Sequence, residues 1–322
     1  MEDHRLKFGK ACKSMNSISG FTVVRDAIKQ GYPFVESIAS VLPVCDEFLV
    51  SDGYSSDGTY EVLRKIASVN KRVKIFQNEW PRTGLTVIAD LSNEMRRKCK
   101  SDYLFYLQAP EIVHEDSVTM IKALPEIFPQ AETFCLPFIG VVSNFKVQEE
   151  FRLRFCRNLD RLILTGDAWT FSTSKDFLKS EAWSNIIHPK KLMSYVGRGI
   201  DWTYAGTLNN NRSKGVYLPK PILRYTALFK ENFLERCRGH AELLNVASYN
   251  DVLKEAEKAQ GDSFFEIAAS LHRKMIGINY PSSLETVAKE DHPQIMRELV
   301  ENKEKRIRYY VRDSLIEAIA DA

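Results

Sequence analysis

The chain has 322 residues and a mass of 37.0 kDa, enough for one large domain or two ordinary ones. Hydrophobic residues make up 44% and charged residues 27%, which excludes a disordered chain, a collagen-like repeat and a small disulfide scaffold. With 45 Lys and Arg against 42 Asp and Glu, the net charge of +3 is too balanced for a dedicated nucleic-acid binder.

The first half of the chain alternates strand and helix patterns. Short apolar and β-branched runs predict strands, and the segments between them, with apolar residues three or four apart, predict amphipathic helices. This alternation is typical of a parallel, doubly wound sheet. The predicted strands are residues 21–24, 47–51, 73–76 and 103–107, and the predicted helices are 33–42, 60–67 and 85–99.

The pattern changes after the fourth strand. Residues 133–142 and 151–157 predict longer strands, and the polar run 209–215 (NNNRSKG) predicts a loop. The simple alternation has stopped there, so we expect a mixed sheet with an insertion that builds a site.

From about Phe229 onward the chain reads as helical. Helices are predicted at residues 252–259 and 263–276, each with a capping Asn or Asp before it and a glycine after it. A third, long helix is predicted from about Asp291 to about Ala320, because its apolar residues recur four or eight positions apart.

The six cysteines are scattered and form no Cys-x-x-Cys pair, so neither a zinc site nor a thioredoxin-like motif is indicated. Unpaired cysteines suit a reducing compartment. No apolar run approaches the roughly 20 residues needed to span a bilayer. We expect a cytoplasmic protein, with at most a peripheral contact to a membrane.

The loop after the second predicted strand carries the first candidate site residue. The strand runs directly into Asp52-Gly53, which places the Asp52 carboxylate at the carboxyl edge of the sheet, where open α/β sheets bind ligands. There it can accept hydrogen bonds from a base or a ribose; the alternative is an ordinary Asp-Gly turn. Asp57 precedes a predicted helix, and we expect it to cap that helix.

Four short motifs follow one another between residues 18 and 230. They are Arg25-Asp26 with the later run Ser55-Ser56-Asp57-Gly58-Thr59; Gln108-Ala109-Pro110-Glu111 with His114-Glu115; the strand Phe151-Arg152-Leu153-Arg154; and Gly166-Asp167-Ala168 with Phe171. In this order they resemble the motifs of family-2-like glycosyltransferases with a GT-A fold. The resemblance implies a Rossmann-like mixed sheet and a nucleotide-diphospho-sugar donor whose sugar passes to an acceptor hydroxyl.

The resemblance also assigns residues to the donor. It places Asp52 against the base or ribose of the nucleotide, with Arg25 and Asp26 flanking the same pocket. From the residues alone, Arg25 and Asp26 are equally well explained as a solvated loop pair.

One departure from the family concerns the metal. The family carries an acidic pair after its fourth strand that holds manganese or magnesium, but Pro110 stands at the first position and only Glu111 remains. One carboxylate is a poor site for these ions. We therefore expect cationic side chains to hold the donor diphosphate, with Arg224 as the first candidate and a solvated surface as the alternative for the rest. The other candidates are Lys220, Arg212 and Lys214.

Asp167 is the best candidate for the general base of an inverting transfer, which needs a carboxylate near the acceptor hydroxyl. The alternative is a turn aspartate, and Asp201 is a weaker rival for the role. Glu111 is a candidate for orienting a sugar hydroxyl or holding a residual metal, or it is a plain loop residue.

We therefore expect a GT-A-like domain at residues 1–230 and a helical C-terminal extension at 231–322, with the activity of a glycosyltransferase of the hexosyltransferase type. The alternatives are a non-catalytic nucleotide-sugar or glycan-binding protein that kept the fold and, ranked last, a nucleotidyltransferase. The expected acceptor is a glycan or a lipid-linked molecule. The C-terminal helices are candidates for homo-oligomer contacts, and their basic run is either a solvated face or a dock for lipid phosphates. That run is Lys303, Lys305, Arg306, Arg308 and Arg312.

Overall fold

The computed structural model describes residues 16–80, 86–168, 170–172, 202–208, 211–215, 218–244, 254, 257–258, 264–275, 285–302 and 308–321. For 202–208, 211–215, 239–244, 271–275 and 321 only the backbone is described. In this part of the chain, no helix is long and apolar enough to cross a membrane.

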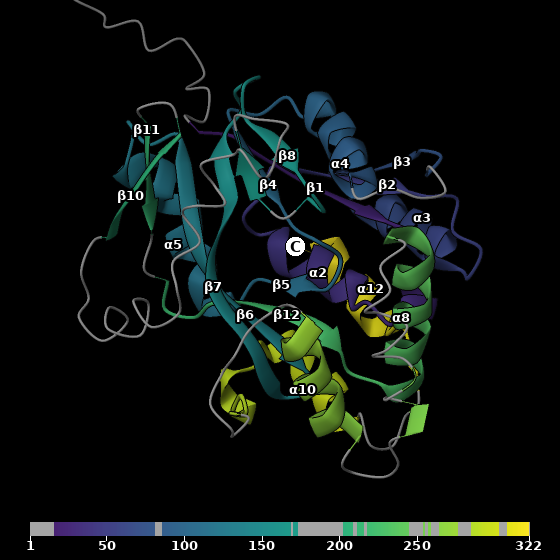
Figure 1. Ribbon diagram of the computed structural model, residues 1–322. Coiled ribbons are helices and arrows are strands. Elements are labelled where there is room, and N and C mark those ends of the chain that lie inside the picture. The colour runs from purple at the N-terminus through teal and green to yellow at the C-terminus, as the bar shows by residue number, and fades with distance from the viewer. Residues whose placement is uncertain are drawn as a thin grey trace, which may run out of the picture.

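The fold is built on a mixed sheet, in which ten strands of the described residues take part (Figure 1). The strands of its first half are parallel, and they match the strands predicted from the sequence to within a few residues. They are β1 (Ile18–Val24), β2 (Glu47–Asp52), β3 (Val73–Gln77) and β4 (Tyr103–Tyr106). The spatial order β4-β1-β2-β3 puts β4 on the far side of β1, so the order in which strands are added to the sheet reverses at β1, although β1 and β4 are parallel.

The second half extends the sheet beyond β4. The long antiparallel pair β6 (Thr133–Val142) and β7 (Phe145–Arg157) joins β4 through β7, and β10 (Trp202–Leu208) and β11 (Asn211–Gly215) form the far edge. Two further strands, β5 (Glu111–Ile112) and β12 (Ile222–Ala227), pair with each other, and β12 also pairs with β6. The predicted loop at 209–215 is wrong for its last five residues, because backbone pairing with β10 and β6 outweighs their polar composition.

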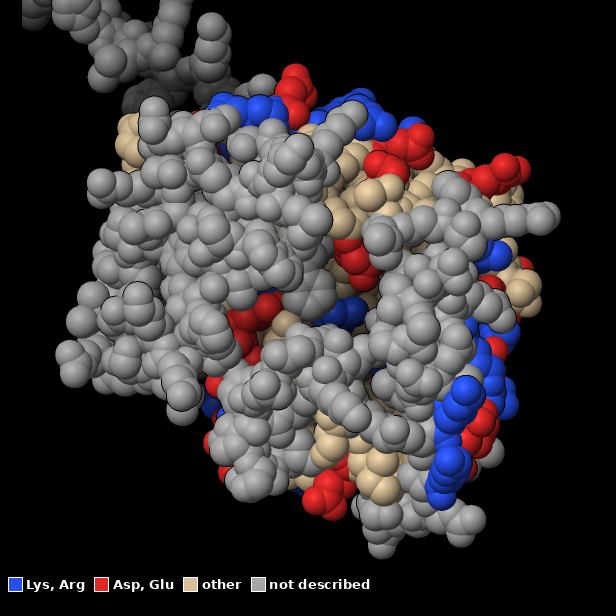
Figure 2. All heavy atoms as spheres, viewed as in Figure 1, with Lys and Arg blue, Asp and Glu red and all other residues tan. Residues whose placement is uncertain are grey.

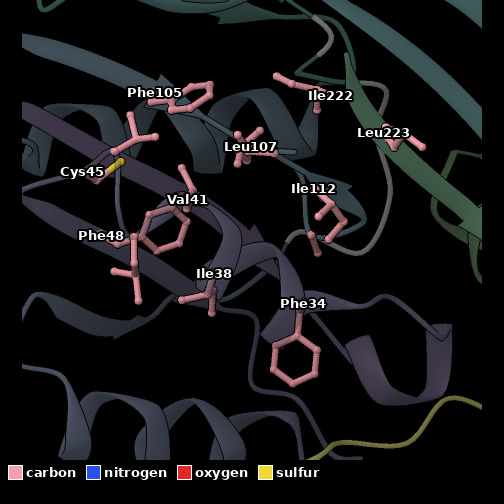
Figure 3. Close-up of a cluster of buried hydrophobic side chains, with 14 of the residues drawn as sticks. Phe34, Ile38, Val41, Cys45, Phe48, Phe105, Leu107, Ile112, Ile222 and Leu223 are labelled. Carbon is pink, nitrogen blue, oxygen red and sulfur yellow. The ribbon is translucent and has the colours of Figure 1, made fainter. Parts of the chain in front are cut away.

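Helices and a small hairpin cover the two faces of the sheet. Apolar side chains alternate along each strand, as the pleat of a strand requires. In β4, for example, Phe105 packs with α2 (Phe34–Val41) on one face, whereas Leu104 packs with α4 (Val87–Lys98) on the other. On the α2 side, Ile38 and Val41 lie beside Phe48 of β2, whereas the Phe34 ring points away from the strands (Figure 3) and lies 6.2 Å from the Tyr309 ring. The other helices of this half are α1 (Ala27–Gln30), α3 (Thr59–Val69) and α5 (Glu115–Ile127).

The C-terminal part is helical, as expected, but its last predicted helix is not continuous. The helices are α8 (Lys230–Leu244), α10 (Phe264–Met275), α11 (Gln294–Asn302) and α12 (Asp313–Asp321), with a short 3-10 turn, η2 (Lys289–Asp291), before α11. Residues 309–312 between α11 and α12 are not helical. Met296, Leu299 and Ile316 belong to the same apolar cluster as α2, so these helices share the core of the sheet. Most of the helix predicted at 252–259 lies outside the described residues.

The break in the predicted long helix coincides with contacts to a buried carboxylate in α2. Glu36 is fully buried and accepts hydrogen bonds from the Tyr309 hydroxyl, at 2.9 Å, and from Arg312 Nη2, at 3.1 Å. Burial raises the pKa of Glu36, and the charge of Arg312 opposes that rise. The Tyr309 amide also donates to the Asn232 side chain, and these contacts with α2 and α8 accompany the loss of helical structure at 309–312. Arg312, predicted as part of a basic face, is engaged here.

Asn232 in α8 connects the C-terminal part to the loop that follows β1. Its side-chain amide donates to the carbonyls of Ile28 and Lys29, and its carbonyl oxygen accepts from the Tyr309 amide at 2.6 Å. Gly31 has a left-handed φ of 70°, and a Cβ atom there would lie 2.2 Å from the Cβ of Asn232. The close approach of α8 to this loop therefore needs glycine at 31.

We expect Asn232→Ala to lower the free energy of unfolding by about 3 kcal/mol, because it leaves buried backbone groups unsatisfied. Urea denaturation measures this change. Arg238→Ala on the same helix is the matched control; its ion pairs are exposed, so its effect should stay within about 1 kcal/mol. Equal effects of the two substitutions would contradict the assigned role of Asn232.

Candidate functional site

A narrow pocket opens at the carboxyl ends of the parallel strands β1 and β4, where the strand order reverses. Ligands of open α/β sheets bind at such a switch point. The ends of the two strands supply Val24, Arg25, Tyr106 and Gln108, and the pocket has a volume of about 90 Å³. The remaining lining residues named here are Gln30, Tyr32, Trp80, Ile88, Pro110, Asp167 and Arg224. Figure 2 shows acidic and basic side chains together in a hollow of the face viewed in Figure 1.

Asp167 lies on a tight turn between two short strands. The antiparallel hairpin of β8 (Ile163–Thr165) and β9 (Thr170–Ser172) packs on the α4 side of the sheet. Gly166 and Ala168, on either side of Asp167, both have left-handed φ values, 60° and 49°. A non-glycine residue in this conformation is uncommon and persists where its surroundings hold it.

Two hydrogen bonds hold this turn against the sheet. Arg154 Nη1 in β7 donates to the Ala168 carbonyl at 3.1 Å, and Gln108 Nε2 donates to the Asp167 carbonyl at 3.2 Å. The position of the Asp167 carboxylate is therefore set by β7 and by the loop after β4.

The Asp167 carboxyl has an electrostatic environment suited to proton transfer. Burial raises its pKa to about 6, while the positive charges of Arg224, Arg152 and Arg154 limit the rise. Its Oδ1 is buried and accepts no hydrogen bond from the described residues. A carboxylate with a pKa near 6 is ionised at neutral pH and is still basic enough to take a proton.

Arg224 reaches the pocket from β12. Its strand pairs with β5, where Arg224 stands opposite Glu111, and the Tyr225 amide donates to the Pro110 carbonyl. Among the described residues, the Nε of Arg224 is buried and has no hydrogen-bond acceptor. Arg224 and Asp167 line the same pocket, so the structure brings together two of the residues predicted from the sequence.

Glu111 lies beneath the pocket and does not line it. It is fully buried, and its Oε1 binds Arg154 Nη2 at 2.6 Å and Arg152 Nη1 at 3.2 Å, while its Oε2 accepts from the Gln108 amide. Burial raises the pKa of Glu111, but the charges of Arg154, Arg152 and Arg224 outweigh burial and hold that pKa below its usual value. Arg152 also pairs with Glu150.

These contacts do not fit a divalent metal ion. Both oxygens of Glu111 are already engaged, and three arginine charges surround it. No group of three or more His, Cys, Asp or Glu side chains with metal-binding geometry occurs in the described part of the chain. Manganese and magnesium need several oxygen ligands, so the described residues offer neither the ligands nor the negative charge for such a site.

Arg25 and Asp26 follow β1 and differ in their surroundings. Arg25 lines the pocket, and its side chain is 45% exposed. Asp26 has a left-handed φ of 47°, and its carboxylate accepts from the Ser56 amide at 2.7 Å. Asp26 thus connects the loops after β1 and β2. Donor binding by Asp26 stays a prediction.

Asp52 ends β2 and is fully buried beside the pocket. Its Oδ2 accepts from the Ser55 amide at 3.1 Å and from Gln77 Nε2 at 3.3 Å, whereas its Oδ1 has no partner among the described residues. Trp80, which lines the pocket, packs on Gly53, where a Cβ atom would lie 2.6 Å from the indole nitrogen. Asp52 is therefore adjacent to the pocket wall.

The remaining candidates lie away from the pocket or outside the described side chains. Lys220 Nζ binds Asp291 at 2.5 Å, and Lys220 does not line the pocket. Asp201 and the side chains of Arg212 and Lys214 lie outside what is described. Asp57, expected to cap α3, is not its N-cap residue, because Gly58 occupies that position; Asp57 lies one residue earlier and accepts from the Thr59 amide at 3.0 Å and from the Lys29 amide.

Several residues of the site were not assigned a role from the sequence. Trp80, Tyr106 and Gln108 line the pocket, and Arg152 and Arg154 form the ionic layer below it. The two arginines are spaced two apart in a predicted strand, so both point to one face. Charged residues at such positions of an otherwise apolar strand are the signal that indicates a buried ionic cluster.

Comparisons with known proteins give structural similarities only. No family model matches the chain, and no curated protein matches it. Among solved structures, Staphylococcus aureus TarS 1–349 in complex with UDP is 14% identical, with 92% of this chain and 94% of that chain covered and a TM-score of 0.39.

Two further structures are less completely covered. GalNAc-T7 with UDP, GalNAc and Mn²⁺ is 14% identical over 48% of this chain and 24% of that chain, with a TM-score of 0.28. Mycobacterium tuberculosis glucosyl-3-phosphoglycerate synthase is 14% identical over 40% and 46%, with a TM-score of 0.30. Because these TM-scores are below 0.5, the functional assignment rests on the pocket itself.

We expect Glu111→Gln to lower the free energy of unfolding by about 3–5 kcal/mol, because it leaves Arg152 and Arg154 buried with less compensating charge. Thermal and urea denaturation measure the loss. Glu126→Gln, an exposed change on α5, is the control and should stay within about 0.5 kcal/mol. A native-like stability for Glu111→Gln, together with loss of a manganese-induced rise in melting temperature, would instead indicate a metal ligand.

Proposed function

We propose that the protein is an inverting glycosyltransferase that moves a sugar from a nucleotide-diphospho-sugar to an acceptor hydroxyl. The observation that carries this proposal is the pocket at the switch point, which combines a carboxylate of pKa about 6, Asp167, with the arginines Arg25 and Arg224. Such a transfer uses a base and positive charge for the diphosphate; Arg224 supplies that charge from a strand, and Arg25, which also pairs with Asp26 at 3.8 Å, supplies it from the loop after β1.

In the proposed reaction the acceptor oxygen attacks the anomeric carbon from the face opposite the diphosphate. The new carbon–oxygen bond forms as the bond to the phosphate oxygen breaks, and the electron pair of that bond leaves with the nucleoside diphosphate. The acceptor proton passes to the Asp167 carboxylate. Inversion follows because attack and departure occur on opposite faces of the sugar.

Arg224 and Arg25 are the proposed partners of the diphosphate. A guanidinium binds phosphate oxygens through two parallel hydrogen bonds and keeps its charge at every working pH. The position of Arg224 in the pocket wall supports this role. We place the diphosphate at the mouth of the narrow pocket and the nucleoside toward Trp80 and Asp52.

No metal ion has a part in this mechanism, since the residues around Glu111 do not fit one. The arginine side chains instead supply positive charge to the departing diphosphate, which is the transition-state stabilisation that a metal otherwise provides. The same absence of a metal ligand pair favours a second candidate function, a non-catalytic nucleotide-sugar-binding protein. Turnover separates the two.

We expect Asp167→Asn to lower turnover at least about a hundredfold, because a positioned base contributes roughly that much or more. The measurement is UDP release from a panel of UDP-sugars, with water as the acceptor. In the native protein, turnover at saturating donor should rise with pH through about 6, because Asp167 is active when ionised. Arg224→Met should shift this rise in turnover to higher pH, since the charge of Arg224 lowers the pKa of Asp167.

Two controls belong to this experiment. UDP affinity should change less than about threefold in Asp167→Asn, and the variant should be at least as stable as the native protein at pH 8, because burial disfavours the charged carboxyl. Full turnover by the variant would remove Asp167 from the role of base. Tight UDP binding without turnover of any UDP-sugar by the native protein would favour the non-catalytic function.

Diphosphate binding by arginine side chains should not depend on a metal ion. Calorimetry should show that one of UDP, GDP and dTDP binds equally well in EDTA and in manganese. Arg224→Met should weaken binding of the preferred nucleoside diphosphate roughly tenfold or more, the loss expected for a hydrogen-bonded ion pair. Lys220→Met is the matched control and should leave affinity unchanged. Binding that requires manganese would contradict capture by arginines.

A further inference from the structure

Gly53 is the point where the loops after three strands of the sheet meet. Its amide donates to the Val24 carbonyl at the end of β1, at 2.8 Å. The Asn78 amide, which follows β3, donates to the carbonyl of Asp52, the residue before Gly53, at 3.0 Å. The backbone around Gly53 is therefore held from both sides, and it cannot withdraw from a group that approaches it.

Two side chains of the pocket wall fill the space beside this glycine. A Cβ atom at position 53 would lie 2.6 Å from Nε1 and 2.7 Å from Cδ1 of Trp80, and 3.0 Å from Cβ of Arg25. Non-bonded heavy atoms pack at about 3.5–4.0 Å, so a methyl group fits here only if Trp80 moves. The φ of Gly53 is not left-handed. An alanine therefore suits the backbone, and its cost falls on the neighbouring side chains.

The indole of Trp80 is oriented by this contact and not by a hydrogen bond. Its Nε1 faces Gly53, is buried and has no acceptor among the described residues. A buried indole N–H ordinarily has a partner, so the ring is held in this orientation in spite of its polar group. Trp80 is partly exposed and lines the pocket. Because its only ring nitrogen is buried, the accessible part of the ring is carbon, which suits stacking.

The size of the pocket limits what it can enclose. Its volume of about 90 Å³ is below the roughly 300–1,000 Å³ of pockets that hold a whole small ligand. A nucleoside diphosphate must therefore lie partly outside, against side chains of the rim. Of the other aromatic lining residues, Tyr106 is fully buried and Tyr32 packs against the core on the α2 side. Trp80 adjoins Asp52 across Gly53.

We propose that the base of the donor nucleotide stacks on the indole of Trp80, and that Gly53 is the positioning residue that sets this ring. The inference rests on the proposed function, since it takes the pocket as the site of a nucleoside diphosphate. It makes glycine at position 53 a requirement of donor binding rather than of the fold.

Calorimetry with whichever of UDP, GDP and dTDP binds most tightly tests the stacking contact. We expect Trp80→Ala to weaken binding about tenfold or more, since stacking of one base on an aromatic side chain contributes roughly five- to a hundredfold. Trp80→Phe, which keeps an aromatic face, should lose less than about threefold. Equal losses in the two variants would contradict stacking, and so would an unchanged affinity in Trp80→Ala.

Gly53→Ala tests the positioning role through a double-mutant cycle. In the native background it should weaken binding of the same nucleotide about tenfold, because the added methyl group displaces the indole. In the Trp80→Ala background the same change should cost less than about threefold, since no ring remains to be displaced. An equal loss in both backgrounds would overturn the role of Gly53, because the effect would then not pass through Trp80.

Gly58→Ala in the same loop is the matched control. Gly58 has a left-handed φ of 94°, so an alanine strains the backbone there, but its Cβ would keep 3.7 Å from the side chain of Ile28. We expect this variant to lower the melting temperature and to leave nucleotide affinity unchanged. A loss of affinity like that of Gly53→Ala would show that binding follows the stability of the loop, and the inference would be wrong.

The outcomes separate this inference from the proposed function. If Arg224→Met weakens nucleotide binding and Trp80→Ala does not, the base lies elsewhere and the diphosphate site stands. If none of the three nucleotides binds to the native protein, the proposed function is the part that fails.

Discussion

The compensation of one buried carboxylate, Glu111, determines how the candidate site is assembled. A charge that is fully removed from water is tolerated only beside a partner of opposite charge, and Glu111 has two, Arg152 and Arg154. Strand β7 must therefore place both guanidinium groups under the loop after β4. Arg154 then holds the carbonyl of Ala168, so the same ion pair positions the turn that carries Asp167. The chemistry of the pocket depends on an ionic layer that no substrate touches.

The sheet and its first helices could be predicted because their signals are local. Apolar alternation and caps indicate β1 to β4 and their helices from a few neighbouring residues at a time. The errors arise where a distant partner decides. Residues 211–215 are polar, yet they pair with β10 and β6. The segment with Tyr309 and Arg312 has helical periodicity, yet it is not helical, and the carboxylate of Glu36 and the side chain of Asn232 bind it.

The site was predictable to the extent that its residues follow strands directly. Arg25 and Asp167 stand at strand ends or in a tight turn, and Arg224 was chosen for its charge; all three line one pocket. Lys220 was chosen for the same reason, but a sequence does not reveal that Asp291, far along the chain, engages it. Glu111 shows a further limit of prediction from sequence. Its place in a motif does not reveal whether the carboxylate faces a ligand or two buried arginines.

The bond between Glu36 and the segment at 309–312 has a consequence for how the chain acquires its structure during synthesis. The Tyr309 hydroxyl and the Glu36 carboxylate are separated by 273 residues. At roughly 5–20 residues per second on a ribosome, helix α2 exists for tens of seconds before Tyr309 and Arg312 emerge. Until then its carboxylate must stay hydrated or protonated, and α2 cannot settle on the central strands with that charge. The packing of α2 is therefore completed only after residues 309–312 have emerged, a long-range closure that slows folding.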